Sequence, residues 1–232
     1  MRGLGPLSRL MILLAVPALL GACATPLLTA DPAEVARAAY VDDAPPSITL
    51  LTVVNSASGA GDHSALIING SQRLLYDPAG SFSHPAAPQS LDVHYGFRPQ
   101  IEDFYMNYHA RETHHIITQE VLISPEVAEV ALRAAMSENK ARQGQCSTKT
   151  TAVLRAAGFE GVGGSVWPRT TMNNFAETPG VRTLVLIAPG MTPQVWGLND
   201  ADMARAVRVT APSGLLRILA TRADTPMAAL TN

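Results

Sequence analysis

Several features that mark large classes of protein are scarce in this chain. Charged residues make up 16% of its 232 residues, and the 17 Lys and Arg are scattered rather than clustered. A nucleic-acid-binding surface requires clustered basic residues, so the sequence argues against nucleic acid as a partner. Apolar residues, at 47%, are numerous enough for a sizeable core, which excludes wholesale disorder, and the length suits one domain with extensions.

The apolar run at residues 10–20 is too short to cross a membrane, because a spanning helix needs about 20 apolar residues. Arg2 and Arg9 precede this run, and residues 1–22 contain no acidic residue. A short apolar segment after basic residues is typical of an export signal. We therefore predict that residues 1–22 form a signal peptide that is removed from the mature protein.

The signal ends in Leu20-Gly21-Ala22-Cys23, and small residues before a cysteine resemble the lipobox of bacterial lipoproteins. The resemblance implies cleavage before Cys23, acylation of its sulfur and amine, and attachment to the membrane through these lipids. Because Ala24 follows, it also implies a place in the bacterial cell envelope at the periplasmic face of the outer membrane. Residues 23–46, with four prolines, would be the tether. The alternative is a secretory signal that ends near a cysteine by coincidence.

Cysteine is rare, since Cys23 and Cys146 are the only two in the chain. The two would form a single disulfide if both were free in an oxidising compartment. If Cys23 is lipidated, Cys146 has no partner within the chain. A lone thiol in an exported protein invites oxidation unless it is buried or used, which makes Cys146 a candidate functional residue.

Residue patterns divide the mature chain into strands and helices. Segments rich in β-branched and apolar residues predict strands, and capping residues with helical spacing predict helices. The predicted strands are residues 47–54, 63–68, 73–77, 113–123 and 181–187, and the predicted helices are residues 32–39, 101–110, 146–157, 168–176 and one that begins at Ser124-Pro125. The buried faces are expected at Val127, Val130, Ala131 and Ala134 in the helix after Ser124, and at Ala152, Val153 and Ala156 in the next.

Two segments carry no strong strand or helix pattern. Residues 81–99 contain three prolines and are predicted to be a long polar loop, a candidate lid or substrate wall. Residues 191–232 give weak signals only, for a short helix at 199–207 and for a strand or helix at 215–220. We expect residues 47–190 to be the catalytic domain and residues 191–232 to be an extension packed on it.

Cys146 lies where a helix is predicted to begin, within Gln145-Cys146-Ser147. A cysteine in a first helical turn has its thiolate favoured by unpaired N–H groups and the helix dipole. The N–H groups of Cys146 and Ser147 would then face a developing oxyanion, with Gln145 as a candidate second donor. The alternative is a purely structural role, in which Cys146 is a small buried apolar residue.

A thiol nucleophile needs a base and a group that orients the base. His63, at the start of a predicted strand, is the candidate base, and the orienting group should lie on the strand after the Asn69-Gly70 turn. A two-residue turn places His63 opposite Tyr76, and a three-residue loop that includes Ser71 places it opposite Asp77. We favour Asp77 because a carboxylate holds the imidazole tautomer, although an aspartate before Pro78 also suits a turn.

The order of His63-Ser-Ala-Leu-Ile-Ile, Leu75-Tyr76-Asp77 and then Gln145-Cys146-Ser147 resembles the circularly permuted branch of the papain-like NlpC/P60 superfamily. The resemblance covers residues 47–187. It implies an α+β fold with a central antiparallel sheet packed against helices, one of which carries Cys146, and hydrolysis or acyl transfer at an amide, thioester or ester. Many exported members cut peptidoglycan peptides. The third residue is often His in this superfamily, so Asp77 departs from its pattern.

Other kinds of site receive less support. His84, His94, His109, His114 and His115 match no zinc-binding spacing, so we expect no metal and no other cofactor. Tyr76 and Trp167 are expected at the substrate cleft, with core packing as the alternative for Trp167. The sequence thus predicts an envelope-anchored thiol hydrolase acting on an amide. The rival hypothesis is a non-catalytic lipoprotein that uses the same shell to bind a wall peptide or a protein.

Overall fold

The computed structural model describes residues 29–188, 207–210 and 216–220. The predicted signal peptide and Cys23 lie outside these residues, as does most of the helix predicted at 199–207. The helices are α2 (Pro32–Ala38), α3 (Pro99–His109), α4 (Pro125–Ser137), α5 (Cys146–Ala156) and α6 (Pro168–Ala176), with a 3₁₀ turn η2 at Glu160–Val162. The strands are β1 (Ser47–Asn55), β2 (Gly61–Asn69), β3 (Arg73–Tyr76), β4 (Gln89–Ser90), β5 (Val93–Tyr95), β6 (His114–Leu122), β7 (Arg182–Ile187), β8 (Val207–Thr210) and β9 (Leu216–Ala220).

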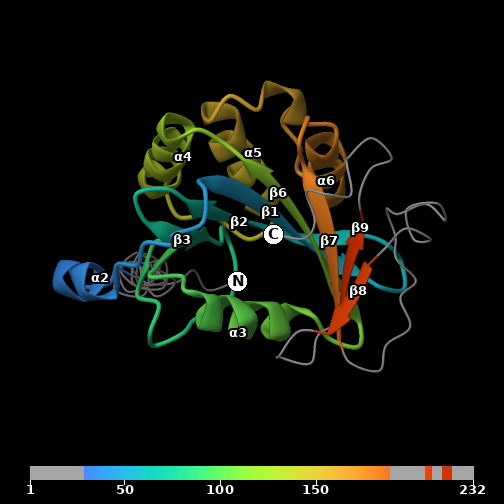
Figure 1. Cartoon of the computed structure of the whole chain (residues 1–232), viewed down its shortest axis with the longest axis horizontal. Coiled ribbons are helices and arrows are strands. Elements are labelled where there is room, and N and C mark those ends of the chain that lie inside the picture. The colour runs from blue at the N-terminus through green and yellow to red at the C-terminus, as the bar shows by residue number, and fades with distance from the viewer. Residues whose placement is uncertain (1–28, 189–206, 211–215, 221–232) are drawn as a thin grey trace, which may run out of the picture.

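The described strands form one antiparallel sheet in the order β4-β5-β3-β2-β1-β6-β7-β9-β8. β1 and β2, of nine residues each, lie near its centre and form a hairpin. β9 and β8, from the segment expected to be an extension, continue the sheet beyond β7 (Figure 1). The segment expected as a strand or helix at 215–220 is therefore a strand within the main sheet.

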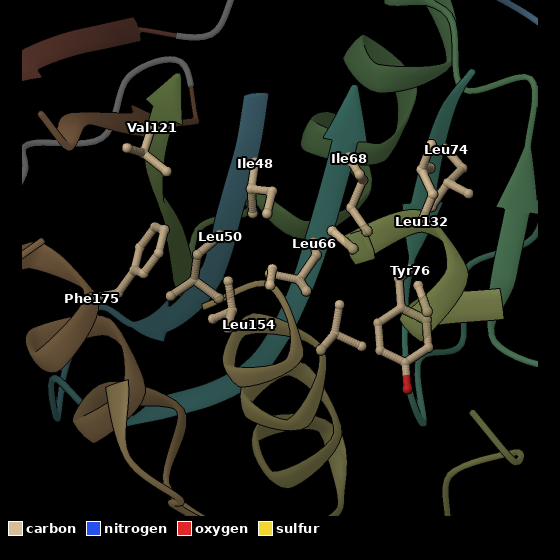
Figure 2. Close-up of a cluster of buried hydrophobic side chains, with 14 of the residues drawn as sticks. Ile48, Leu50, Leu66, Ile68, Leu74, Tyr76, Val121, Leu132, Leu154 and Phe175 are labelled. Carbon is tan, nitrogen blue, oxygen red and sulfur yellow. The ribbon is translucent and has the colours of Figure 1, made fainter. Parts of the chain in front are cut away.

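Helices cover both faces of the sheet, with α4, α5 and α6 on one side and α3 on the other (Figure 1). The side with three helices buries an apolar cluster that Figure 2 shows, in which Leu50 and Leu66 of the central strands meet Leu154 of α5 and Phe175 of α6. The α3 side buries a second cluster, which includes Phe97 and Tyr105. This mixed α+β arrangement confirms the expected antiparallel sheet packed against helices, with Cys146 on one of them.

Capping residues set several helix boundaries as the sequence predicts. The Ser124 side chain accepts a hydrogen bond from the N–H of Val127, and Pro125 follows in the first turn of α4. Gly158, at φ 95°, ends α5 in the left-handed region that glycine tolerates best. Among the described residues, none of the helices combines the length and apolar character needed to cross a bilayer.

The buried faces of two helices differ from those predicted. α4 buries Ala128, Ala131, Leu132 and Ala135, so its core face is rotated by about one residue from the expected one. α5 buries Cys146, Ser147, Thr150, Thr151, Val153 and Leu154, whereas Ala152 and Ala156 are exposed. Thr150 and Thr151 can face inward because their hydroxyls are bonded within the helix: both donate to the Ser147 carbonyl.

Residues 81–99 are not the open polar loop that the sequence predicts. They contain β4 and β5, and β5 pairs with β3 as part of the sheet. Phe82, Val93 and Phe97 are buried. The buried Asp92 accepts hydrogen bonds from the Ala141 N–H at 2.6 Å and from Lys140 at 3.2 Å. These contacts fix the segment to the domain, and a freely moving lid over residues 81–99 is therefore excluded.

Candidate active site

Cys146, His63 and Asp77 come together at one edge of the sheet. β2 begins near His63 and β3 ends just before Asp77, so these two residues lie at the same end of adjacent antiparallel strands. His63 Nε2 lies 2.5 Å from Asp77 Oδ1. Cys146 is the first residue of α5, and its thiol lies close enough to His63 for the imidazole to lower the pKa of the thiol. The imidazole thus lies between a sulfur and a carboxylate, as nucleophilic thiol catalysis requires.

The partner of His63 is the one predicted, but the strand register is not. The loop consists of Gly70, Ser71 and Gln72, because Asn69 pairs with Arg73 and Leu66 with Tyr76. Asp77 therefore stands diagonally from His63 rather than directly opposite. Diagonal neighbours on one face of a sheet still lie within reach of longer side chains, so the hydrogen bond forms despite the offset.

A tight turn holds the Asp77 carboxylate. The Asp77 carbonyl accepts from the Gly80 N–H at 3.1 Å, and Ala79 between them has φ 60°. A Cβ atom at position 80 would lie 1.9 Å from Asp77 Oδ2. Only glycine leaves room there for the carboxylate. Asp77 caps no backbone N–H in this turn. Its side chain points to His63 instead, so the turn-capping interpretation of Asp77 is wrong.

Backbone N–H groups surround the Cys146 sulfur. The backbone N–H groups of Ser64 and Ser147 both lie beside it and favour the thiolate, and Cys146 is 7% exposed. Burial raises the pKa of this thiol, but the bond to His63, the charge of His63 and these two N–H groups outweigh burial and lower the pKa overall. The sequence predicted the contribution of Ser147 from its place in the first turn. It gave no sign that Ser64, on a strand, would contribute as well.

The charge state of His63 follows from its two neighbours. Burial lowers the pKa of His63, yet the Asp77 carboxylate and the bond with Cys146 raise it to about 10. Burial likewise raises the pKa of Asp77, and the charge and hydrogen bond of His63 bring it below its ordinary value. Because the pKa of the thiol is lowered and that of the imidazole is raised, the arrangement favours a thiolate–imidazolium pair over a neutral thiol and a neutral imidazole.

Helix α3 supplies two residues that contact Asp77 and His63 and that the sequence did not reveal. The buried Tyr105 hydroxyl donates to Asp77 Oδ1 at 3.1 Å. One turn later, the His109 ring stacks on His63 with 5.8 Å between centroids and 7° between planes. His109 Nδ1–H donates to the Tyr105 carbonyl at 3.1 Å. The spacing of four residues places Tyr105 and His109 on one face of the helix, which is the only signal that could have singled them out.

The two further oxyanion candidates differ in how their side chains are held. Ser147 is fully buried, and its hydroxyl lies 2.7 Å from that of Thr171 in α6. Its backbone N–H lies beside the Cys146 thiol and helps to lower the pKa of that thiol. Gln145 precedes α5, and its Oε1 accepts from the Arg142 N–H at 2.8 Å. The Gln145 side chain is thus anchored on the loop before the helix, with its carbonyl oxygen already bonded.

A β-bulge lies next to His63. Val53 pairs with His63 and Val54 with Gly61, so Asp62 is an extra residue on β2. Its carboxylate accepts a hydrogen bond from His114 Nε2 at 2.9 Å. Bulges locally redirect the neighbouring side chains of a strand, and many occur beside active sites.

The same strand start is packed tightly against α6. A Cβ at Gly61 would lie 2.6 Å from the Arg169 backbone nitrogen, so this close approach requires glycine. Trp167, directly before α6, is 70% exposed, which overturns core packing as its role. It stands at the end of a helix that contacts β2, and it remains a candidate for substrate contact.

A cleft of about 450 Å³ opens beside the imidazole. It lies between the turn after β3 and the end of α3. The residues that line it are Val53, His63, Ala79, Gly80, Ser81, Tyr108, His109, Arg111, Thr113 and His114. His63 lines this cleft and also contacts Cys146. The cleft therefore reaches the thiol from the side on which His63 lies.

Tyr76 does not line the cleft, contrary to the prediction. It pairs with Leu66 and points to the opposite face of the sheet, where it packs in the cluster of Figure 2 with no exposed surface. Adjacent residues of a strand face opposite sides, so Tyr76 and Asp77 cannot both face His63. Burial raises the pKa of Tyr76, with Glu138 and Asp92 adding to the effect.

The remaining histidines take separate positions. His115 Nδ1 is 3.0 Å from the Ser56 hydroxyl, His114 pairs with Asp62, and His84 packs on Phe82. Within the described ranges, no group of three or more His, Cys, Asp or Glu side chains is arranged to hold a metal ion.

Comparison with known proteins gave no match: the chain matched neither a protein-family model, nor a curated protein, nor a solved structure.

Proposed function

We propose that this protein is a thiol hydrolase acting on an amide bond. Cys146 is the nucleophile, His63 the base and then the acid, and Asp77 the group that orients His63. One observation carries the proposal: a single imidazole contacts both the Cys146 sulfur and, at 2.5 Å, the Asp77 carboxylate. A buried structural cysteine needs neither partner, and a thiol among apolar groups would have a raised pKa rather than a lowered one.

In the acylation step, the Cys146 thiolate attacks the substrate carbonyl carbon. A C–S bond forms, and the C=O electron pair moves to oxygen. Backbone N–H groups at the start of α5, with that of Ser147 foremost, stabilise this oxyanion. The electron pair then returns, the C–N bond breaks, and His63 gives its proton to the departing nitrogen. The products are a free amine and a thioester on Cys146.

In the deacylation step, water attacks the thioester carbonyl and His63 accepts the water proton. Collapse of the second tetrahedral intermediate breaks the C–S bond, which releases a carboxylic acid and restores the thiolate–imidazolium pair. Asp77 keeps its carboxylate throughout. It holds the imidazole and stabilises its charge, and the Tyr105 hydroxyl at 3.1 Å fixes the carboxylate in turn.

We further propose a permuted papain-like fold of the NlpC/P60 type. The support is the chain order, in which a histidine on a central strand and an acid after the next strand precede a cysteine at the start of a helix packed on the sheet. The lipobox at Cys23 supports an anchor in the cell envelope, where peptides of the wall would be the available amide substrates. In a membrane-partition assay, the Cys23→Ser protein should leave the membrane fraction; continued partitioning would disprove the anchor.

The catalytic proposal is tested by the rate at which iodoacetamide alkylates Cys146, followed by mass spectrometry of the peptide that contains it. Wild-type protein should react at neutral pH much faster than an ordinary thiol, and His63→Ala should abolish the excess. His114→Ala is the matched control, because His114 also pairs with an aspartate and lines the same cleft. Slow labelling that His63→Ala leaves unchanged would contradict the enzyme and favour a scaffold that only binds.

Substrate trials follow from the same reasoning. Peptidoglycan fragments, isopeptides and acyl thioesters should be digested side by side, with Cys146→Ala as the control for background hydrolysis. We expect release of an amine that depends on Cys146. Turnover of the thioester alone would replace the amidase proposal by acyl transfer or thioester hydrolysis at the same site.

A further inference from the structure

The cleft beside His63 has a marked charge bias. None of its ten lining residues is Asp or Glu, whereas one is Arg and three are His. Of the histidines, His63 is paired with Asp77 and His114 with Asp62. Arg111 is therefore the one lining residue that carries a permanent charge. Its position and partners indicate what the cleft accepts.

The backbone and side chain of Arg111 are both held in place. Its N–H donates to the His114 carbonyl at 2.9 Å, and the His114 N–H donates back at 3.1 Å. Its Nε donates to the Tyr108 carbonyl at 2.6 Å, and its guanidinium carbon lies 4.9 Å from the centre of the Tyr108 ring. The Tyr108 hydroxyl is fixed in turn, 3.0 Å from that of Ser81. The guanidinium is thus preorganised, which reduces the entropy lost when it binds a ligand.

Arg111 has no carboxylate partner within the part of the chain that the structure describes. Two other arginines do, since Arg73 pairs with Glu102 and Arg182 with Glu120. The charge of Arg111 nevertheless reaches the cleft: burial first, then the charges of His63 and Arg111, lower the pKa of His109. A held guanidinium whose Nη edge is left unpaired at a cleft wall suits a bidentate contact with a carboxylate.

The proton transfer from His63 determines which part of the substrate lies in the cleft that contains Arg111. In the proposed mechanism His63 gives its proton to the departing nitrogen, so the leaving amine lies on the histidine side of Cys146. The cleft that contains Arg111 is on that side. We infer that Arg111 is a specificity-determining residue that binds a carboxylate on the amine half of the substrate. The inference rests on the proposed function and narrows it.

The substrate class that follows is an amide whose amine half is an amino acid or peptide with a free carboxylate. That carboxylate is either the chain terminus or an acidic side chain close to the scissile bond. Both sources offer the same two oxygens to a guanidinium, and neutral or cationic leaving amines would leave Arg111 without a partner. The cleft therefore selects against them.

A first experiment needs no substrate. Iodoacetate and iodoacetamide differ only in the carboxylate, so the ratio of their alkylation rates at Cys146 reports attraction of an anion to this cleft. Arg111→Gln should lower the ratio by about twofold to fivefold, the range for a solvent-accessible charge pair. Arg111→Lys should retain part of it, and Arg133→Gln, an exposed arginine on α4, should leave it unchanged. An equal ratio in wild type and Arg111→Gln overturns the inference.

A second experiment uses peptides that share one acyl half. Their amine halves end in a free carboxylate, in a carboxamide, or in a carboxamide after an acidic residue. Wild type should hydrolyse at least one carboxylate-bearing peptide about tenfold faster in kcat/KM than the carboxamide, mostly through KM, and Arg111→Gln should abolish that preference. Cys146-dependent hydrolysis without a preference overturns the inference alone. Absence of Cys146-dependent hydrolysis for every peptide counts against the proposed function, while the alkylation ratio still decides the role of Arg111.

Discussion

Replacing Asp77 by Asn tests the electrostatics of the candidate site with little change in shape. Burial alone would lower the pKa of His63, and the leading opposing cause is the Asp77 carboxylate, which helps to raise it to about 10. A return from about 10 to the ordinary 6.5 corresponds to about 5 kcal/mol less stabilisation of the imidazolium. Without the imidazolium, the thiol loses its nearest positive charge, so its pKa rises as well.

The measurement is the rate of Cys146 alkylation by iodoacetamide as a function of pH. Wild type should show fast alkylation from mildly acidic pH upward, because the thiolate forms together with the imidazolium. In Asp77→Asn the rise should move to more alkaline pH, and the rate at neutral pH should fall by about tenfold or more. Asp62→Asn is the matched control, because it removes the carboxylate of the other His–Asp pair beside the cleft. Superimposable profiles for wild type and Asp77→Asn would refute the reasoning.

Four further outcomes are expected. Gly80→Ala, whose Cβ would lie 1.9 Å from Asp77 Oδ2, should lower the free energy of unfolding by about 1–3 kcal/mol in a urea titration and slow thiol alkylation. Tyr105→Phe, which removes the donor 3.1 Å from Asp77 Oδ1, should cost about 1–3 kcal/mol in the same titration and slow alkylation less than Asp77→Asn does. Trp167→Ala, at a side chain that is 70% exposed, should change stability by no more than about 0.5 kcal/mol by calorimetry. The extra stability of wild type over His63→Gln should be complete below pH 6.5 and disappear as pH rises through about 10, because the pKa of His63 is raised on folding; a difference that grows with pH would contradict the assigned charge.

The strands and helix starts were predictable because their causes are local. β-branched runs, a serine cap and a proline in the first turn act within a few residues. The core face of α5 was not predictable from apolar spacing, since that criterion selected Ala152 and Ala156 and missed Thr150 and Thr151. A threonine hydroxyl that donates to a carbonyl three or four residues earlier can be buried at little cost, and both threonines do so.

The segment 81–99 was misjudged for the opposite reason, because its order comes from distant residues. Its two strands are too short to show a detectable alternation of apolar and polar residues, and β4 has only two residues. What fixes the segment is the pairing of β5 with β3 and the bonds from Asp92 to Lys140 and Ala141. Lys140 and Ala141 lie 48 and 49 residues from Asp92 along the chain, and Tyr95 of β5 pairs with Leu74 of β3. A short window of sequence around residue 90 therefore does not contain the information.

The hairpin shows why the acid could be predicted although the register could not. Helix α4 selects the loop: Glu129 accepts from the Ser71 N–H at 2.9 Å, and a Cβ at Gly70 would lie 3.0 Å from Leu132. The expected three-residue loop paired His63 with position 77, whereas the observed one directs it to position 79. A shift of two residues preserves the face of the strand, because side chains alternate with a period of two. Asp77 therefore stays within reach of His63. Tyr76, one residue away, faces the opposite side of the sheet in any register in which Asp77 and His63 share a face.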